Sequence, residues 1–190
     1  MEPYRHLFLT GDRQVGKSTL LRHALQACGL RPAGFETRPF FLGGRRMGYV
    51  LHATGPLPEG YGNDTPICVF PASRPVAIPE VFDGFGAALL RTVRDEPLIL
   101  MDELGRLERS APVFQAAVID CLDGPGHVVG VLQKTDQPLL RQIAARADTL
   151  VLTVTPENRD ALLPQLTADI SHRMGLKSFL PCPARAGNAR

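Results

Sequence analysis

The strongest chemical signal in the sequence is a glycine-bounded stretch that ends in a lysine and a serine. Residues 11–18 read GDRQVGKS and fit the pattern G-x-x-x-x-G-K-S/T of a phosphate-binding loop. Backbone amides in such a loop converge on phosphate oxygens, and the following helix adds its positive dipole end. We expect catalytic Lys17 to reach the β- and γ-phosphates and Ser18 to bind Mg²⁺. The predicted nucleotide cradle comprises Gly11, Asp12, Arg13, Gln14, Val15, Gly16, Lys17, Ser18 and Thr19.

A second signal is an apolar run that ends in two acidic residues. Residues 98–103 read LILMDE, a pattern typical of a buried strand followed by the metal-binding acid of phosphoryl-transfer sites. Asp102 is predicted to hold Mg²⁺. Glu103 is predicted to orient or deprotonate an attacking water molecule, which is the task of a general base. The alternative for Glu103 is that it braces the loop against Arg106.

The elements around these motifs alternate between short apolar runs and segments of helical period, which indicates β/α units on a mostly parallel sheet. Strands are predicted at residues 7–10, 98–102, 128–132 and 149–154, and helices at residues 17–28, 79–93, 111–122, 138–147 and 156–170. Residues 35–41 and 46–53 flank Gly43-Gly44 and are predicted to form an antiparallel hairpin. Residues 54–80, rich in Gly and Pro, are predicted to form a long excursion that crosses near the active edge.

Together these patterns predict an α/β protein of the P-loop NTPase fold, with a mostly parallel central sheet flanked by helices and an antiparallel hairpin. The 190 residues are expected to form one domain over residues 1–174 and a frayed tail over residues 175–190. With 21 Lys and Arg against 19 Asp and Glu, the balance of charge does not favour nucleic-acid binding. The four scattered cysteines are interpreted as reduced thiols.

No apolar run approaches the roughly 20 residues of a membrane helix, and the first residues do not resemble a cleavable leader. We therefore expect a cytoplasmic monomer that does not enter a membrane.

The sequence also resembles a known family, the small cancer-related nucleoside-triphosphatases first described from thermophilic prokaryotes. The resemblance extends to about residue 169 and includes, besides the phosphate loop, GF at 34–35 with Thr37, GGRR at 43–46, GY at 48–49, DELGRLE at 102–108, VTPENR at 154–159 and LLP at 162–164. It implies Mg²⁺-dependent hydrolysis of nucleoside triphosphates to diphosphates, with loose base selectivity and slow turnover. The sequence departs from the family at Pro39, where an acidic residue is usual, and at Phe41, where a basic residue is common.

Further polar residues could act at the same site or serve only the fold. Arg38, Arg45 and Arg46 surround the Gly-Gly turn and could clamp phosphate or form a solvated hairpin tip. Arg106 and Glu108 could touch the γ-phosphate, but a salt bridge that fixes their loop is favoured.

Two residues at the end of the last predicted strand, Asn158 and Arg159, are predicted to bind the nucleotide by contacting its base. Entry into the following helix is the alternative role. Lys134 has no assigned role, and the five histidines show no metal-ligand spacing.

Two other functions compete with hydrolysis of ATP, GTP and other nucleoside triphosphates. A nucleotide or nucleoside kinase would pass the γ-phosphate from the same cradle to a small acceptor. A small GTPase switch is suggested by DELG at 102–105 and by QKTD at 133–136, which resembles the guanine-reading motif N-K-x-D except that Gln133 replaces Asn. A module that only binds nucleotide is least favoured, because the motifs supply a complete Mg²⁺-phosphate site.

Overall fold

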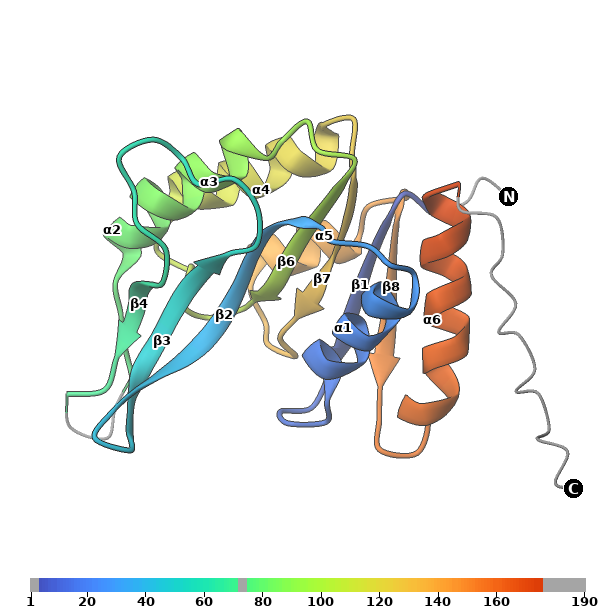
Figure 1. Cartoon of the computed structure of the whole chain (residues 1–190), viewed down its shortest axis with the longest axis horizontal. Helices are drawn as coiled ribbons and strands as arrows, with labels where there is room; N and C mark the ends of the chain where they lie inside the picture. The colour runs from blue at the N-terminus through green and yellow to red at the C-terminus, as the bar shows by residue number, and fades with distance from the viewer. Residues whose placement is uncertain (1–3, 72–74, 176–190) are drawn as a thin grey trace, which may run out of the picture.

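The computed structural model describes residues 4–71 and 75–175, which build a single eight-stranded sheet with helices on both faces (Figure 1). The strand order is β5-β4-β3-β2-β6-β7-β1-β8. The strands are β1 (His6–Gly11), β2 (Ala33–Leu42), β3 (Arg45–Ala53), β4 (Thr65–Val69), β5 (Val76–Ala77), β6 (Leu98–Leu104), β7 (His127–Leu132) and β8 (Thr149–Val154). The helices are α1 (Lys17–Ala27), α2 (Pro79–Val81), α3 (Ala87–Thr92), α4 (Pro112–Asp123), α5 (Pro138–Ala144) and α6 (Arg159–Arg173), with a π-helical turn η1 (Phe82–Gly86).

The sheet divides into a parallel and an antiparallel half. Neighbouring strands in the series β2, β6, β7, β1 and β8 pair in parallel. Strands β3, β4 and β5 extend the sheet from β2 by antiparallel pairing, beginning with the hairpin that turns at Gly43-Gly44. The predicted α/β architecture, its mostly parallel sheet and its antiparallel hairpin are therefore confirmed. Because parallel strands end at the same edge, the segments after β1, β6, β7 and β8 gather there.

The prediction of a long excursion over residues 54–80 was wrong in its main feature. That segment contributes β4 and β5, which lengthen the sheet beyond the hairpin. Ile67 and Cys68 are fully buried, so their side chains leave solvent when β4 pairs with β3.

The helical predictions also need adjustment. The helix predicted over residues 79–93 is broken into α2, η1 and α3, and the last helix begins at Arg159 rather than at residue 156. Apart from Gly175, the predicted tail lies outside the described residues.

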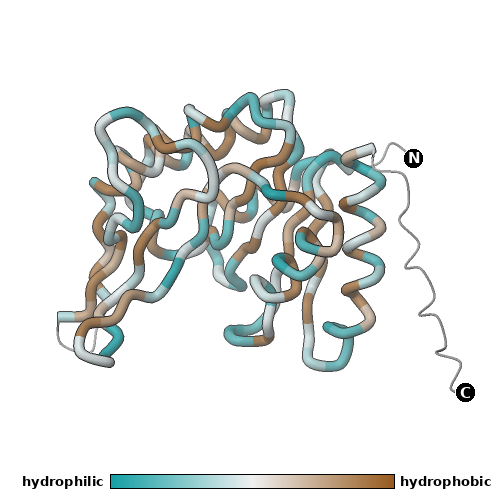
Figure 2. The backbone as a smooth tube through the Cα atoms, viewed as in Figure 1, coloured by the Kyte–Doolittle hydropathy of each residue, from teal (hydrophilic) through white to brown (hydrophobic). Residues whose placement is uncertain are grey.

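Two apolar clusters hold the helices against the two faces. On one face η1, α3, α4 and α5 contribute to one buried cluster, whose aromatic members include Phe35, Phe82, Phe85 and Phe114. On the other face α1 and α6 pack against β1, β7 and β8. The hydrophobic stretches follow the central strands (Figure 2). The edge of the parallel half is thus supported from both sides.

Three of the four cysteines lie within the described residues. Cys28, Cys68 and Cys121 are free thiols, and Cys182 lies outside the described residues. None of the helices within residues 4–71 and 75–175 is long and apolar enough to cross a membrane.

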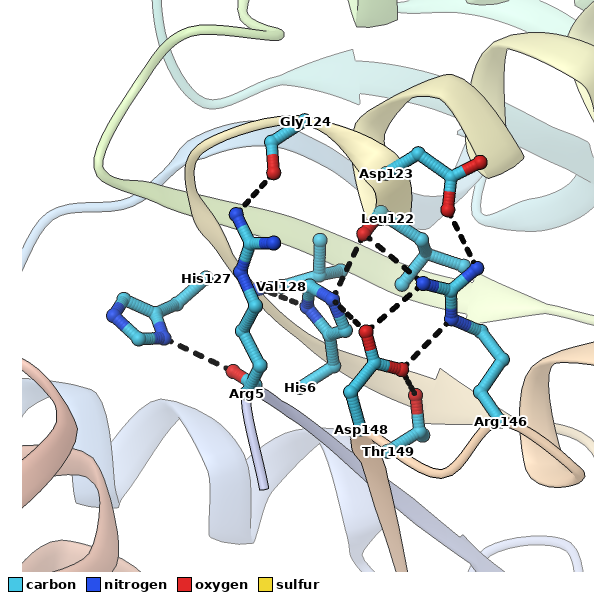
Figure 3. A network of polar contacts seen from close by, with 10 residues as sticks. All are labelled: Arg5, His6, Leu122, Asp123, Gly124, His127, Val128, Arg146, Asp148 and Thr149. Carbon is cyan, nitrogen blue, oxygen red and sulfur yellow. Dashed lines mark hydrogen bonds and ion pairs between the residues drawn. The ribbon is translucent and has the colours of Figure 1, made fainter. Parts of the chain in front are cut away.

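A polar network closes the opposite edge of the parallel half, around the fully buried side chain of His6 (Figure 3). The ring accepts a hydrogen bond at Nδ1 from the Val128 amide (3.1 Å), so Nε2 carries the proton and donates to the Leu122 carbonyl (3.0 Å). Arg146 joins the same region by contacting Asp148 and Asp123. Burial lowers the pKa of His6 to about 4, although the Asp148 carboxylate 3.6 Å away favours the charged form.

We expect His6 to remain neutral, with its proton on Nε2, from pH 8 down to pH 5. A protonated ring would have to place a second N–H against the Val128 amide donor. Because the pKa lies below the usual 6.5, the contribution of His6 to stability is complete above pH 6.5 and declines as the pH falls toward 4. Long-range ¹H–¹⁵N spectra of the imidazole across this pH range measure its protonation. An imidazolium signal from His6 at pH 6 would contradict the assignment.

Candidate active site

The phosphate-binding motif forms a tight loop between β1 and α1, and its two glycines occupy positions that side chains would disturb. Gly11 and Gly16 both have positive φ angles, of 142° and 96°. A Cβ on Gly11 would lie 2.3 Å from the Val154 carbonyl oxygen of neighbouring β8. The loop can therefore adopt this conformation beside β8 only with glycine at residue 11.

Lys17 lies at the start of α1 and is buried, with 8% of its surface exposed. Its Nζ donates hydrogen bonds to the carbonyl oxygens of Gly11 (3.1 Å) and Asp12 (2.9 Å). Within the described part of the chain, no carboxylate forms an ion pair with this ammonium group. A buried cation held only by neutral carbonyls favours the approach of an anion, since burial without a counter-charge is unfavourable.

Ser18 and Asp102 meet across the sheet edge, although 84 positions separate them in the sequence. The Ser18 hydroxyl donates a hydrogen bond of 2.8 Å to Oδ1 of Asp102, which ends the apolar part of β6. Burial raises the pKa of Asp102 to about 6; the Ser18 hydrogen bond opposes this shift, and the charges of Glu103 and Glu36 add to it. A nearby divalent cation would favour the ionised form of this carboxyl group.

The Ser18–Asp102 pair fits the requirements of Mg²⁺. Hydroxyl and carboxylate oxygens are the hard donors that this ion prefers, and it commonly takes few protein ligands beside phosphate and water. No group of three or more His, Cys, Asp and Glu side chains suited to a metal occurs among residues 4–71 and 75–175. The pair thus resembles a shared phosphate–metal site rather than a site enclosed by protein ligands.

Glu103 is held by Gln133, the residue that directly follows β7. Oε1 of Glu103 accepts a hydrogen bond from Nε2 of Gln133, while Oε1 of Gln133 accepts one from the Arg106 amide (3.2 Å). A Cβ on Gly105 would lie 2.1 Å from the Gln133 side chain, so the close approach requires glycine. In the sequence Gln133 was considered only as part of the guanine-reading alternative, and its contact with Glu103 was not predicted.

Arg106 and Glu108, which come soon after Asp102 and Glu103 in the sequence, each have a separate hydrogen-bond partner. The Glu108 carboxylate, 2% exposed, accepts a hydrogen bond from the Gly105 amide. Burial raises the pKa of Glu108 to about 7, and hydrogen bonds from the backbone oppose the shift. Arg106 instead donates through Nε to the Thr135 hydroxyl (3.1 Å). The structural role favoured for both residues agrees with these contacts, but the predicted salt bridge between them is absent among the described ion pairs.

The predicted base contacts lie at the β8 end of the edge. The Asn158 amide closes the turn before α6: Nδ2 donates to the Thr153 carbonyl (2.9 Å) and Oδ1 accepts from the Thr155 amide (2.8 Å). These bonds fit the alternative role, in which Asn158 shapes the turn that leads into α6. Contact of Asn158 with a nucleotide base stays a prediction. Arg159 lies beside the phosphate loop, since a Cβ on Gly16 would be 3.2 Å from its Cδ.

Lys134 also reaches the phosphate loop, through an exposed ion pair between its Nζ and Oδ1 of Asp12 (3.0 Å).

The arginines of the hairpin, Arg38 and Arg46, contact different groups. The guanidinium of Arg46 lies over Tyr49 and Phe70, with its carbon 5.6 and 5.5 Å from the ring centroids. Arg38 instead binds Glu36 (2.8 Å). Arg46 therefore packs against the hairpin itself and against the end of β4. Arg38, through Glu36, lies nearer the edge of the sheet that carries Asp102.

Two cavities adjoin this edge. One, of about 400 Å³, lies between α5 and the ends of β7 and β1, and residues 133–136 contribute to its wall. The other, of about 580 Å³, lies beside α1 and includes Ser18 and Asp102 in its lining. Ligand-sized space is therefore present beside α1 and beside α5.

Comparison with known proteins identifies the family of the chain. A family model described as NTPase matches residues 6–167. The chain is 32% identical to the human "Cancer-related nucleoside-triphosphatase" over 184 residues, covering 85% of this chain and 94% of the relative. It is 29% identical to "Nucleoside-triphosphatase THEP1" of Thermofilum pendens over 174 residues, covering 88% and 96% of the two chains.

Two solved structures share the fold. The solution structure of a human cancer-related nucleoside triphosphatase has a TM-score of 0.68 at 28% identity and covers 88% of this chain and 98% of its own. The crystal structure of THEP1 from Aquifex aeolicus has a TM-score of 0.66 at 23% identity and covers 85% and 96%.

Proposed function

The chain belongs to the NTPase family, and from this premise we propose that it is a Mg²⁺-dependent enzyme that hydrolyses ATP, GTP and other nucleoside triphosphates with loose base selectivity. As a member of this family the protein is a nucleoside-triphosphatase. Its requirement for Mg²⁺ and its loose base selectivity are proposed. The observation that carries the proposal is the buried Lys17 ammonium, which donates to two loop carbonyls and has no ion-pair partner in the described part of the chain, beside the Ser18–Asp102 pair.

In the proposed reaction, the amides of the phosphate loop and Lys17 bind the β- and γ-phosphates. Mg²⁺, held by Ser18 and Asp102, would neutralise charge on the phosphate oxygens when bound. Glu103, oriented by Gln133, accepts a proton from a water molecule as its oxygen attacks the γ-phosphorus. The bond between this phosphorus and the bridging oxygen breaks, and nucleoside diphosphate and phosphate leave. Lys17 stabilises the charge that develops during this step.

Base selectivity is proposed to be loose because the recognised motifs are suited to phosphate and metal rather than to a base. The side-chain amide of Asn158, the candidate base contact, already bonds to the backbone of its own turn. The GTPase-switch alternative is weakened by Gln133. In a guanine-reading loop this position would face the base, whereas here its side chain bonds Glu103 and the Arg106 amide.

We expect ATP, GTP, CTP and UTP all to be consumed, with kcat/KM values within about 100-fold of one another, or about 2.7 kcal/mol of discrimination. Phosphate release measured with each triphosphate checks this result. The same assay with EDTA in place of Mg²⁺ should show almost no release. A larger preference for GTP would favour the switch, and full activity in EDTA would contradict the metal assignment.

A further inference from the structure

The cavity of about 580 Å³ beside α1 continues directly from the proposed γ-phosphate site. Ser18 and Asp102 form part of its wall, and the wall then follows α1 as far as Gln26. Eight residues of helix correspond to about 12 Å along the axis. The cavity thus has one end at Ser18 and Asp102, the pair proposed to hold Mg²⁺ beside the γ-phosphate, and enough length for a second molecule.

The near end carries a carboxylate for which hydrolysis gives no task. Glu36, on β2, is paired in register with Asp102 on the neighbouring strand β6. The side chain of Glu36 is 15% exposed. Arg38 contacts Glu36 through both Nε and Nη2, at 2.8 Å each, and both bonds go to Oε2. No residue in the described ranges hydrogen-bonds Oε1, so this oxygen can accept a proton from a molecule in the cavity.

The rest of the wall combines apolar surface with the polar side chains of Arg22, Gln26 and Arg31 and with one hydroxyl group that lacks a partner among the described residues. Leu21, Leu25, Leu30 and Leu100 supply the apolar part. Thr54, just after β3, also lines the cavity, and its Oγ1 is buried with no hydrogen-bond partner among residues 4–71 and 75–175. Because buried hydroxyl groups are usually paired, this atom indicates a polar group of a ligand. A molecule with a flat apolar body and several hydroxyl groups fits this lining.

We propose that this cavity, the acceptor pocket, binds a nucleoside and that the protein transfers the γ-phosphoryl group to one of its hydroxyl groups as well as to water. The proposal rests on the proposed function, because it uses the same bound triphosphate. At the near end, Oε1 of Glu36 can accept the proton that a hydroxyl group loses as it attacks. The volume lies within the range of small-molecule sites.

The transfer step is balanced without a further reactant. The nucleoside hydroxyl oxygen attacks the γ-phosphorus and forms the new phosphate ester bond. The bond from this phosphorus to the bridging oxygen breaks, and its electron pair leaves with the nucleoside diphosphate. The hydroxyl proton passes to Oε1 of Glu36 and later to solvent. The products are a nucleoside diphosphate and a nucleoside monophosphate.

The test supplies [γ-³²P]ATP and Mg²⁺ with adenosine, guanosine, cytidine or uridine, and separates labelled nucleoside monophosphate from labelled phosphate. We expect at least one nucleoside to become labelled. Glu36→Gln should reduce transfer by about 100-fold, the scale of a lost general base, while phosphate release without nucleoside stays within about threefold of the parent. Glu59→Gln, which changes an exposed loop carboxylate, should leave both reactions unchanged.

A second variant tests the pocket without changing shape or charge. Thr54→Val removes the unpartnered hydroxyl and leaves the bond from the Thr54 amide to the Gly34 carbonyl (2.9 Å) in place. We expect it to raise the KM for the nucleoside several-fold and to leave the KM for ATP unchanged.

The outcomes separate this inference from the proposed hydrolysis. Phosphate release without labelling of any of the four nucleosides would overturn the acceptor pocket and leave hydrolysis intact. Transfer that Glu36→Gln does not reduce, or transfer only to nucleoside monophosphates, would also overturn it. Transfer without any phosphate release in the absence of nucleoside would instead overturn the hydrolase.

Discussion

Replacing Lys17 by alanine is expected to lower phosphate release from ATP by about 1,000-fold and to weaken triphosphate binding. The variant removes a buried positive charge that donates to the loop carbonyls of Gly11 and Asp12. A preorganised donor of this kind stabilises charge that develops in the transition state, and loss of one such group typically costs about 100- to 1,000-fold in rate. Steady-state phosphate release and calorimetric titration with a non-hydrolysable ATP analogue measure the two effects.

The matched control is Lys134→Ala, which removes the other lysine that contacts the loop. Lys134 forms an ion pair with Asp12 in which both side chains are largely exposed, so its loss should have a small effect. Circular dichroism and thermal unfolding establish that Lys17→Ala is folded. A folded Lys17→Ala protein with the parent rate would contradict the phosphate-loop assignment.

The substitution Glu103→Gln is expected to separate binding from chemistry. It preserves the size of the side chain and an oxygen to accept the Gln133 hydrogen bond, but removes the carboxylate that would accept the proton from water. Ser18, Asp102 and the phosphate loop are unaffected. Affinity for Mg²⁺ and triphosphate should therefore stay near that of the parent, while turnover falls by about 100-fold or more. Calorimetry and single-turnover hydrolysis on the same preparation measure both quantities.

Glu80→Gln is the control for this variant, because it makes the same chemical change at an exposed position of α2. Unchanged hydrolysis in Glu103→Gln would remove Glu103 from the mechanism and direct attention to Glu108 or Lys134. A joint decline of affinity, turnover and thermal stability would show that Glu103 mainly braces its loop.

The parallel half of the fold could be predicted from the sequence because its information is local. The motif at residues 11–18 contains its own loop geometry, and the apolar run before Asp102 is a buried strand in both the prediction and the structure. Strand β4 was missed as a sheet member because its five residues lie among Gly and Pro. Its burial depends on pairing with β3, and no local pattern describes that contact.

The same distinction holds for the site. Lys17 and Ser18 follow from one contiguous motif, whereas the contact of Glu103 with Gln133 joins the ends of two strands whose neighbourhood is set by sheet order. Glu36 gave no signal at all, since its place next to Asp102 depends on the register of β2 against β6. Which residues face one another on neighbouring strands depends on contacts between distant parts of the chain. A short stretch of one sequence therefore does not reveal it.

The position of β1 has a consequence for the order in which the molecule is assembled. During synthesis the amino-terminal segments emerge first, but β1 pairs only with β7 and β8, which are made near the end of the described chain. Parallel pairing between such distant segments is slow, because a large loop must close before the contacts form. The segment proposed to hold phosphate is therefore translated before its partner strands and pairs with them late. If nucleotide binds the assembled loop as proposed, it should favour completed chains over partly folded ones by mass action.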